Sequence, residues 1–376
     1  MLTFFLVAAV LFLAYANGAN DNFKGVATLY GSRTTSYTVA LAIATVATLA
    51  GALASFWFAQ ELFVAFSGKG LVPHALAASP QFLLAVAAGA ALTVITATRV
   101  GMPVSSTHAL LGALVGGGIA GAGGEINFAH LGGTFFLPLL LSPMAAALLT
   151  MPLYALAQAA VGWLGVTRQS CVCVAAGQFV PAPRIGGVAV ASLSVTPQIV
   201  LGEVATCVNK YEGALFGVRA QSAVDGLHYA SAAAVCFARG LNDTPKILGL
   251  LFVVTTFDLI INVLAVALAM GAGGLFSARR VAHTMSQDIA RMNDGQSLVA
   301  NLVTAMMVIA ASKFGLPVST THVSVGAISG IGVLNGSANW PVMRQIALSW
   351  VGTLPLAACL SALFYAALAA IASPPR

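Results

Sequence analysis

The chain has 376 residues, of which 59% are hydrophobic and only 7% are charged. Soluble globular domains are about one-quarter charged, so this composition excludes an ordinary soluble protein and indicates a protein embedded in a lipid bilayer. The formal charge of +6 does not indicate a nucleic-acid partner, because the basic residues are scattered along the sequence and form no cluster.

Five apolar segments follow one another in the first half of the chain. Most of them have about the 20 residues that a helix needs to cross roughly 30 Å of hydrocarbon, whereas a transmembrane barrel would show alternating strands of about ten residues. The first segment ends in "AYA", which is compatible with signal cleavage, but no lysine or arginine precedes it, so we expect it to be retained. The segments cover residues 1–17, 37–59, 82–98, 103–120 and 134–164.

The central part of the chain, residues 165–222, is less apolar and contains proline, glycine and β-branched residues. We interpret it as a cytoplasmic linker. Its three cysteines do not follow a zinc-binding pattern, and we interpret them as reduced structural thiols. They are Cys171, Cys173 and Cys207.

The part of the chain after the linker again contains five apolar segments. We therefore predict two membrane repeats, residues 1–164 and 223–376. The segments of the second repeat are 223–239, 247–270, 297–312, 317–334 and 342–371.

Two short motifs occur once in each half, in the same order. The first reads G-x-N-D-x-x-K, as "GANDNFK" from Gly18 and as "GLNDTPK" from Gly240. The second reads "GMPVSSTHALLGA" from Gly101 and "GLPVSTTHVSVGA" from Gly315. One G-x-N-D element alone would carry no information, but two ordered pairs at similar spacing indicate an internal duplication.

The duplication and the positive charges together predict the topology. An odd number of spans in each half gives the two halves opposite orientations in the membrane. With both termini outside, most lysines and arginines fall in cytoplasmic loops, as the positive-inside rule requires. We therefore predict an all-α polytopic membrane protein, with two inverted-topology repeats of about five spans each and discontinuous helices at the repeat interface, where secondary transporters bind their substrates.

The second motif predicts an anion site at a helix start. Glycine and proline end the preceding helix, and we expect Pro103 and Pro317 to begin the next one. The hydroxyl groups that follow then lie in first turns whose backbone N–H groups lack partners, where the helix dipole favours a tetrahedral oxyanion. In the alternative interpretation each hydroxyl only caps or bonds its own helix, which does not explain why the block occurs twice. The hydroxyl residues are Ser105, Ser106, Thr107, Ser319, Thr320 and Thr321.

The first motif places an asparagine and an aspartate inside the membrane twice, as Asn20-Asp21 and as Asn242-Asp243. An intramembrane carboxylate is costly and indicates a functional group. Beside an anionic substrate, the four side chains could hold a coupling cation such as Na⁺, or the carboxylates could accept a hydrogen bond from a protonated oxyanion. Hydrogen phosphate carries such a proton near neutral pH and sulfate does not, so the aspartates favour phosphate. In the alternative interpretation each aspartate caps the helix that follows.

Other polar residues near the motifs are candidates for accessory roles. Lys24 and Lys246 lie one helical turn after their aspartates and could pair with the carboxylate, bind phosphate or extend towards the membrane surface. His108 and His322 could shuttle a proton or donate a hydrogen bond to a neighbouring span. Asp258 has no equivalent in the first half, and we interpret it as an acid that is paired for a structural reason or that supports the site residues.

At these motifs the sequence resembles the inorganic phosphate transporter (phosphate permease) family, which has duplicated G-x-N-D and P-V-S-[ST]-T-H elements in two inverted halves. The resemblance implies phosphate symport driven by H⁺ or Na⁺, and in some bacterial members uptake of a metal–phosphate complex. One departure is Arg239, which stands where the first half has Asn17. The resemblance implies binding roles for Asn20, Asp21, Ser105, Ser106, Thr107, Asn242, Asp243, Ser319, Thr320 and Thr321.

The sequence thus predicts a transporter and not an enzyme. We expect a multi-pass protein of the cytoplasmic (inner) membrane that imports inorganic phosphate by alternating access. We expect Na⁺ or H⁺ as its coupling ion, no other cofactor and no resident metal. The sequence leaves open whether the protein forms a homodimer. A sulfate permease on the same scaffold is an alternative, since a tetrahedral oxyanion site serves either substrate. A more remote alternative is an intramembrane Ser/His/Asp hydrolase, for which Ser105 and His108 could meet on one helix.

Overall fold

The computed structural model describes residues 1–123, 125–163, 172–174, 199–201, 214–215, 218–251, 258–288, 292 and 294–372. The chain forms two compact units. The larger unit combines Met1–Met151 with His228–Arg376, and the smaller unit is Pro152–Leu227.

The smaller unit contains short antiparallel strand pairs in its described part. Strand β1 (Val172–Val174) pairs with β2 (Ile199–Leu201), and β3 (Ala214–Leu215) pairs with β4 (Val218–Arg219). Most of the predicted linker 165–222, including Cys171 and Cys207, lies outside the described residues. Its role stays a prediction, as does the division of the chain into two repeats.

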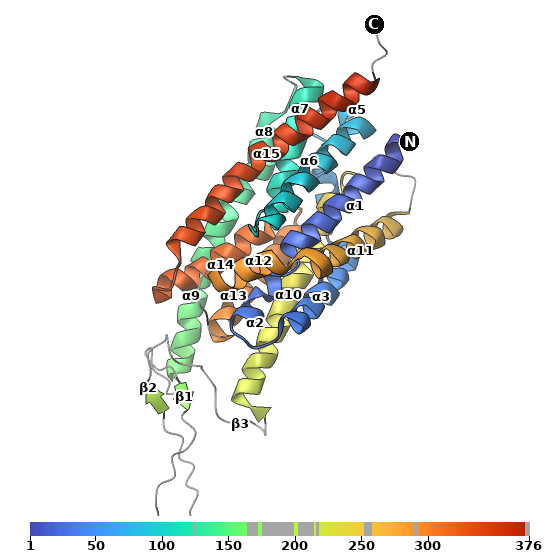
Figure 1. The fold of residues 1–376 in the computed structure, drawn as a ribbon. Coiled ribbons are helices and arrows are strands. Elements are labelled where there is room, and N and C mark those ends of the chain that lie inside the picture. The colour runs from blue at the N-terminus through green and yellow to red at the C-terminus, as the bar shows by residue number, and fades with distance from the viewer. Residues whose placement is uncertain are drawn as a thin grey trace, which may run out of the picture. The chain divides into compact units, whose positions relative to one another are not determined.

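The first half of the larger unit is helical, with short connecting turns (Figure 1). A 3₁₀-helix, η1, follows α1, and a π-helical turn, η2, leads into α9. The elements are α1 (Leu2–Asp21), η1 (Lys24–Val26), α2 (Ala27–Gly31), α3 (Tyr37–Phe58), α4 (Gln60–Ala65), α5 (His74–Ala77), α6 (Pro80–Arg99), α7 (Ser106–Ala122), α8 (Phe128–His130), η2 (Leu131–Phe136) and α9 (Leu137–Trp163).

The second half follows the same order of long helices, which places both motifs in equivalent elements. The first motif lies at the end of α1 and within α10, and the second motif leads into α7 and α14. The elements are α10 (Ala220–Leu248), α11 (Leu259–Ser277), α12 (Arg279–His283), the π-helical η3 (Thr284–Asp288), α13 (Asp294–Lys313), α14 (Thr320–Asn335) and α15 (Trp340–Ala372).

Seven helical segments of the described chain are long and apolar enough to cross a membrane, which confirms the predicted all-α polytopic membrane fold. The three other predicted spans correspond to α7, α10 and α14, which carry or directly follow three of the four motif copies. Helix α7 has 17 residues, or about 25 Å, and α14 has 16; α10 contains several charged side chains. The seven segments are Leu2–Gly31, Tyr37–Phe58, Pro80–Arg99, Phe128–Ala159, Leu259–Ser277, Asp294–Lys313 and Trp340–Ile371.

Three predicted span boundaries around the G-x-N-D motifs are wrong. We expected the helices to end before the motifs, but α1 continues to Asp21 and α10 continues through its motif to Leu248. Helix α10 even includes Pro245, which removes one backbone N–H from its ladder. The predicted span at 247–270 begins only at Leu259, in α11.

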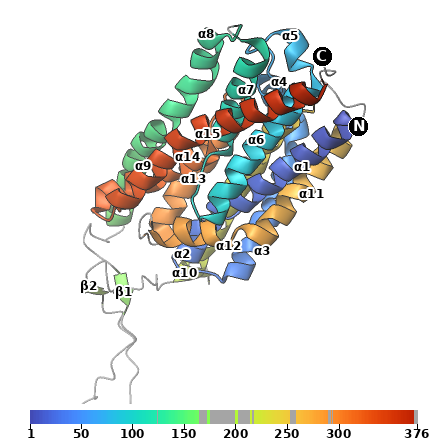
Figure 2. The ribbon, with the colours of Figure 1, turned by 45° about the horizontal axis from the view of Figure 1, so that its top comes forward.

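Helices of the two halves pack closely against each other at glycines. The backbone of Gly18 in α1 contacts the carbonyl of Met270 in α11, and Gly240 in α10 contacts that of Thr48 in α3. Helix α1 lies beside α11, and α15 lies beside α6 and α7 (Figures 1 and 2). Small residues let membrane helices approach closely, so the arrangement ties each half to the other. The start of α1 and the end of α15 lie at the same end of this unit.

Candidate functional site

Two extended segments, one in each half, lead into α7 and α14. Each follows a glycine with positive φ, Gly101 (φ 77°) and Gly315 (φ 65°), which only glycine adopts without strain. The helices begin at Ser106 and Thr320, so the expectation that Pro103 and Pro317 begin them is wrong.

Serine caps explain where these helices begin. The hydroxyl oxygens of Ser105 and Ser319 accept hydrogen bonds from the backbone N–H groups of His108 (3.1 Å) and His322 (3.3 Å). A serine at the N-cap satisfies one of the unpaired donors of the first turn. The capping interpretation is therefore correct for these two hydroxyls, and the other four stay buried near the helix starts.

Asn20 and Asn242 hold the extended segments in place. Asn20 accepts a hydrogen bond from the backbone N–H of Val104 (3.1 Å) and donates to the carbonyl of Met102 (3.0 Å). Asn242 donates to the carbonyl of Val318 (3.3 Å). A helix beginning at the preceding prolines would draw these backbone groups into its first turn. The predicted role of both asparagines as ion ligands stays a prediction, and the structure adds a positioning role.

Asp21 and Asp243 are buried and have polar partners. Asp21 accepts hydrogen bonds from Lys24, from the hydroxyl of Ser106 (2.9 Å) and from the amide of Asn17 (3.0 Å). Asp243 accepts one from Lys246 (3.4 Å). Since Asp21 ends α1 and Asp243 lies within α10, neither caps a following helix, and the structure contradicts that alternative.

The side chains of Lys24 and Lys246 each contact a residue of the other half. Besides its own aspartate, Lys24 contacts the carbonyl of Val104 (2.7 Å) and the hydroxyl of Thr321 (2.6 Å) in the second half. Lys246 correspondingly contacts the carbonyl of Val318 (2.6 Å) and, in the first half, the hydroxyl of Thr107 (2.8 Å). Both lysines therefore pair with their aspartates instead of extending towards the membrane surface.

Asn17 joins the two carboxylates, a role that the sequence did not predict. Its amide nitrogen lies 3.0 Å from Asp21 Oδ2, 3.2 Å from Asp243 Oδ2 and 2.9 Å from the Ser106 hydroxyl. The available signal was its position four residues before Asp21, which places both side chains on one helix face. The two motifs thus form one buried polar cluster, which we call the motif cluster. Its members are Asn17, Asp21, Lys24, Ser106, Thr107, Asp243, Lys246, Thr320 and Thr321.

His108 and His322 meet at the interface of the halves. Their rings pack edge to face with centroids 4.4 Å apart. The Nδ1 atoms lie 3.2 Å from the carbonyl oxygens of Trp350 and Leu139, and because a carbonyl only accepts, each ring donates there, as expected for a bond to a neighbouring span. Ser105 meets His108 through the backbone N–H of His108 and not through its ring, so this structure does not form the pairing that the hydrolase alternative requires.

Three further residues with titratable side chains, His228, Asp258 and Arg239, lie outside the motif cluster. His228, which had no predicted role, contacts Asp294 (3.2 Å) and the hydroxyl of Thr28 (3.1 Å). Asp258 is exposed and caps α11 by accepting from the N–H of Ile260 (3.2 Å), so it is not the paired acid that we expected. Arg239 is fully buried, and one of its nitrogens lies 3.5 Å from an amide oxygen in the first half.

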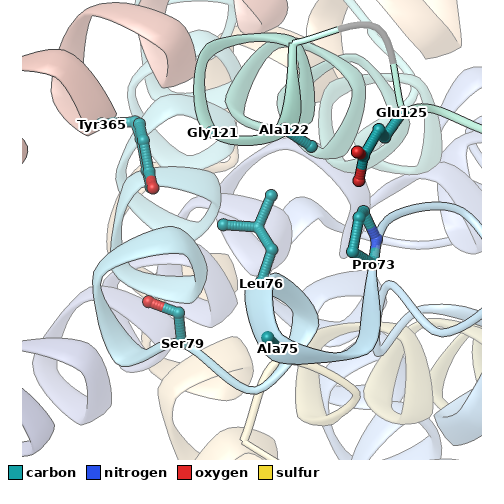
Figure 3. A pocket seen from close by; sticks show the side chains of 8 residues that line it. All are labelled: Pro73, Ala75, Leu76, Ser79, Gly121, Ala122, Glu125 and Tyr365. Atoms are coloured by element: carbon teal, nitrogen blue, oxygen red, sulfur yellow. The ribbon is translucent and has the colours of Figure 1, made fainter.

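The motif cluster is closed to solvent. A surface cavity of about 390 Å³ in the described part of the chain contains none of the predicted site residues (Figure 3). The side chains of the cluster are buried in this structure. The cavity is lined by Pro73, Ala75, Leu76, Ser79, Gly121, Ala122, Glu125 and Tyr365.

Comparisons with known proteins cover almost the whole chain. Residues 17–361 match the family model described as the phosphate transporter family. The chain is 27% identical to a probable low-affinity inorganic phosphate transporter of Rhizobium meliloti (strain 1021), covering 96% of this chain and 94% of that protein. It is 26% identical to a putative phosphate permease of Pyrococcus abyssi (strain GE5 / Orsay), covering 94% of this chain and 95% of that protein.

A solved structure has the same fold. The structure described as the sodium-dependent phosphate transporter aligns with a TM-score of 0.77 and covers 98% of this chain and 99% of its own. The sequence identity is 21%, so this likeness supports a shared fold alone.

Proposed function

The chain belongs to the phosphate transporter family, and we propose that it is a secondary active transporter that imports inorganic phosphate across the cytoplasmic membrane, coupled to Na⁺ or H⁺. One observation carries the proposal: acids, lysines and hydroxyl groups of both halves converge in the motif cluster. The cross-half contacts Lys24–Thr321, Lys246–Thr107 and Asn17–Asp243 define it.

The chemistry of the cluster suits a tetrahedral oxyanion. Helices α7 and α14 begin here, so their positive dipole ends and first-turn N–H groups point towards the same region. Ser106, Thr107, Thr320 and Thr321 add hydroxyl groups that can donate to phosphate oxygens. The carboxylates of Asp21 and Asp243 can accept the proton that hydrogen phosphate carries.

We further propose that the two halves are inverted repeats that move against each other. Residues of both halves contribute to the motif cluster, and the start of α1 and the end of α15 lie at the same end of the larger unit. Rocking one set of helices against the other would expose the cluster alternately to each face of the membrane.

Labelled phosphate should accumulate in proteoliposomes that contain the purified chain when Na⁺ and H⁺ gradients are both imposed. Empty liposomes provide the background. Uptake no faster than this background would contradict the proposed function.

Phosphate and arsenate should compete for uptake of labelled phosphate, whereas sulfate should not. The physical reason is that the carboxylates of Asp21 and Asp243 repel an oxyanion without a proton and accept a hydrogen bond from one that has a proton. Initial rates at neutral pH with an excess of each competitor measure this selectivity. Strong competition by sulfate would instead support the sulfate permease.

Single cysteines at Lys69 and Arg280, in a background without the native cysteines, should react with an impermeant maleimide from opposite sides of the membrane. Both positions are exposed. We expect labelling at position 69 in intact cells and at position 280 only after permeabilisation. If both cysteines reacted from the same side, the predicted inverted topology would have to be rejected.

A further inference from the structure

The coordination of the two lysine ammonium groups points to the cation requirement of this transporter. Each lysine side chain is only 2% exposed, next to an aspartate side chain that is at most 2% exposed. Each Nζ atom contacts three oxygens of different kinds: a carboxylate, a backbone carbonyl and a threonine hydroxyl. For Lys24 these belong to Asp21, Val104 and Thr321.

Lys246 has the equivalent set of ligands from the other half. Its three oxygens belong to Asp243 (3.4 Å), Val318 (2.6 Å) and Thr107 (2.8 Å). Because an ammonium group has three N–H donors, three oxygens satisfy it completely. Neither lysine therefore has a donor left for a phosphate oxygen without breaking one of these contacts.

Carboxylate, carbonyl and hydroxyl oxygens are the ligands that proteins use for hard cations. The carbonyls of Val104 and Val318 can accept these hydrogen bonds because they lie in extended segments, outside the backbone hydrogen bonds of a helix. A free monovalent cation would find the same three ligand types here as the ammonium does. The ammonium group carries the same charge and is joined covalently to the chain.

We propose that Lys24 and Lys246 are tethered counter-ions, which occupy the cation positions beside Asp21 and Asp243 and make transport by this chain independent of Na⁺. This inference rests on the proposed phosphate transport. In this respect the inference distinguishes the chain from the protein of the similar solved structure, which is described as sodium-dependent.

The first experiment replaces Na⁺ by choline during phosphate uptake into proteoliposomes. We expect the same initial rate in both salts, and a loss of uptake in choline would overturn the inference. Absence of uptake in both salts would contradict the proposed function instead. In that case the stability measurement described next still tests the inference, since it needs no transport.

The second experiment vacates one ammonium position. In Lys24→Ala the missing side chain leaves the carboxylate of Asp21 without its cation, so Na⁺ should bind there and raise the melting temperature, because a ligand that binds only the folded state stabilises it. Lys24→Met is the matched control, since its apolar chain fills the same space, and it should not respond to Na⁺. The wild type should not respond either.

Three results of these experiments would overturn the inference. Equal stabilisation of the wild type and Lys24→Ala by Na⁺ over choline would place the cation elsewhere and overturn the inference. A Lys24→Ala protein that folds but does not respond would overturn it as well. If Lys24→Ala does not fold, Lys246→Ala with Lys246→Met provides the equivalent pair at the second site. Failure of both alanine variants to fold, with both methionine variants folded and active in choline, would overturn a counter-ion role.

Discussion

Replacing Asp21 or Asp243 by asparagine is expected to abolish phosphate uptake while the protein stays in the membrane. Asparagine keeps the shape of the side chain but loses its charge, so the ammonium of Lys24 or Lys246 becomes an uncompensated buried charge. Such a loss costs about 3–5 kcal/mol of folding stability. The variant also lacks the carboxylate that would accept the proton of hydrogen phosphate, so we expect the initial rate of labelled phosphate uptake to fall to the background of empty liposomes.

Two further variants separate transport from folding. Asp258→Asn changes an exposed aspartate that caps α11, and it should transport nearly as well as the wild type. Asp21→Asn combined with Lys24→Met removes both buried charges, so it should recover stability but not uptake. Near-normal uptake by both single variants would exclude the aspartates from the site.

Valine at Gly18 or Gly240 should prevent correct folding. Even the first carbon of a side chain at these positions would overlap the backbone carbonyl of Met270 or Thr48, and a backbone cannot rotate away as a side chain can. Overpacking typically costs about 1–3 kcal/mol, and we expect values at or above the upper end. The yield of monodisperse protein in detergent and its melting temperature measure the effect.

Gly352→Val is the matched control for these variants. Gly352 also lies in a long helix, α15, but a Cβ atom there would have no neighbour within 4 Å outside that helix in the described part of the chain. Its valine variant should therefore fold like the wild type. If the valine variants at Gly18 and Gly240 behaved like this control, the close approach of helices across the halves would be wrong.

The membership of the motif cluster could be predicted from the sequence because its residues occur twice. The duplication identified Asp21 with Asp243, and the hydroxyl blocks with each other, without any knowledge of distances. Asn17 was missed because its counterpart is Arg239, so the duplication gave no signal there. The contact between His108 and His322 was missed because their motifs do not specify how α7 and α14 cross.

Helix boundaries were less predictable because tertiary contacts decide them. Glycine and asparagine have low helix propensity, which made the G-x-N-D motif look like a helix end. In the structure Gly18 and Gly240 are required by close packing inside helices, and this packing overrides the propensity. Pro103 favoured a helix start for a local reason, but Asn20 keeps the backbone of Val104 extended and the cap at Ser105 begins the helix later.

The pairing of each aspartate with a lysine of its own segment has a consequence for biosynthesis. The ribosome completes the first half before the second half exists, and an unpaired carboxylate in lipid is costly. Asp21 is already paired with Lys24 one turn later, and Asp243 with Lys246. Each half can therefore enter the bilayer with its acid neutralised, and only the contacts of Lys24 with Thr321 and of Lys246 with Thr107 have to wait for assembly.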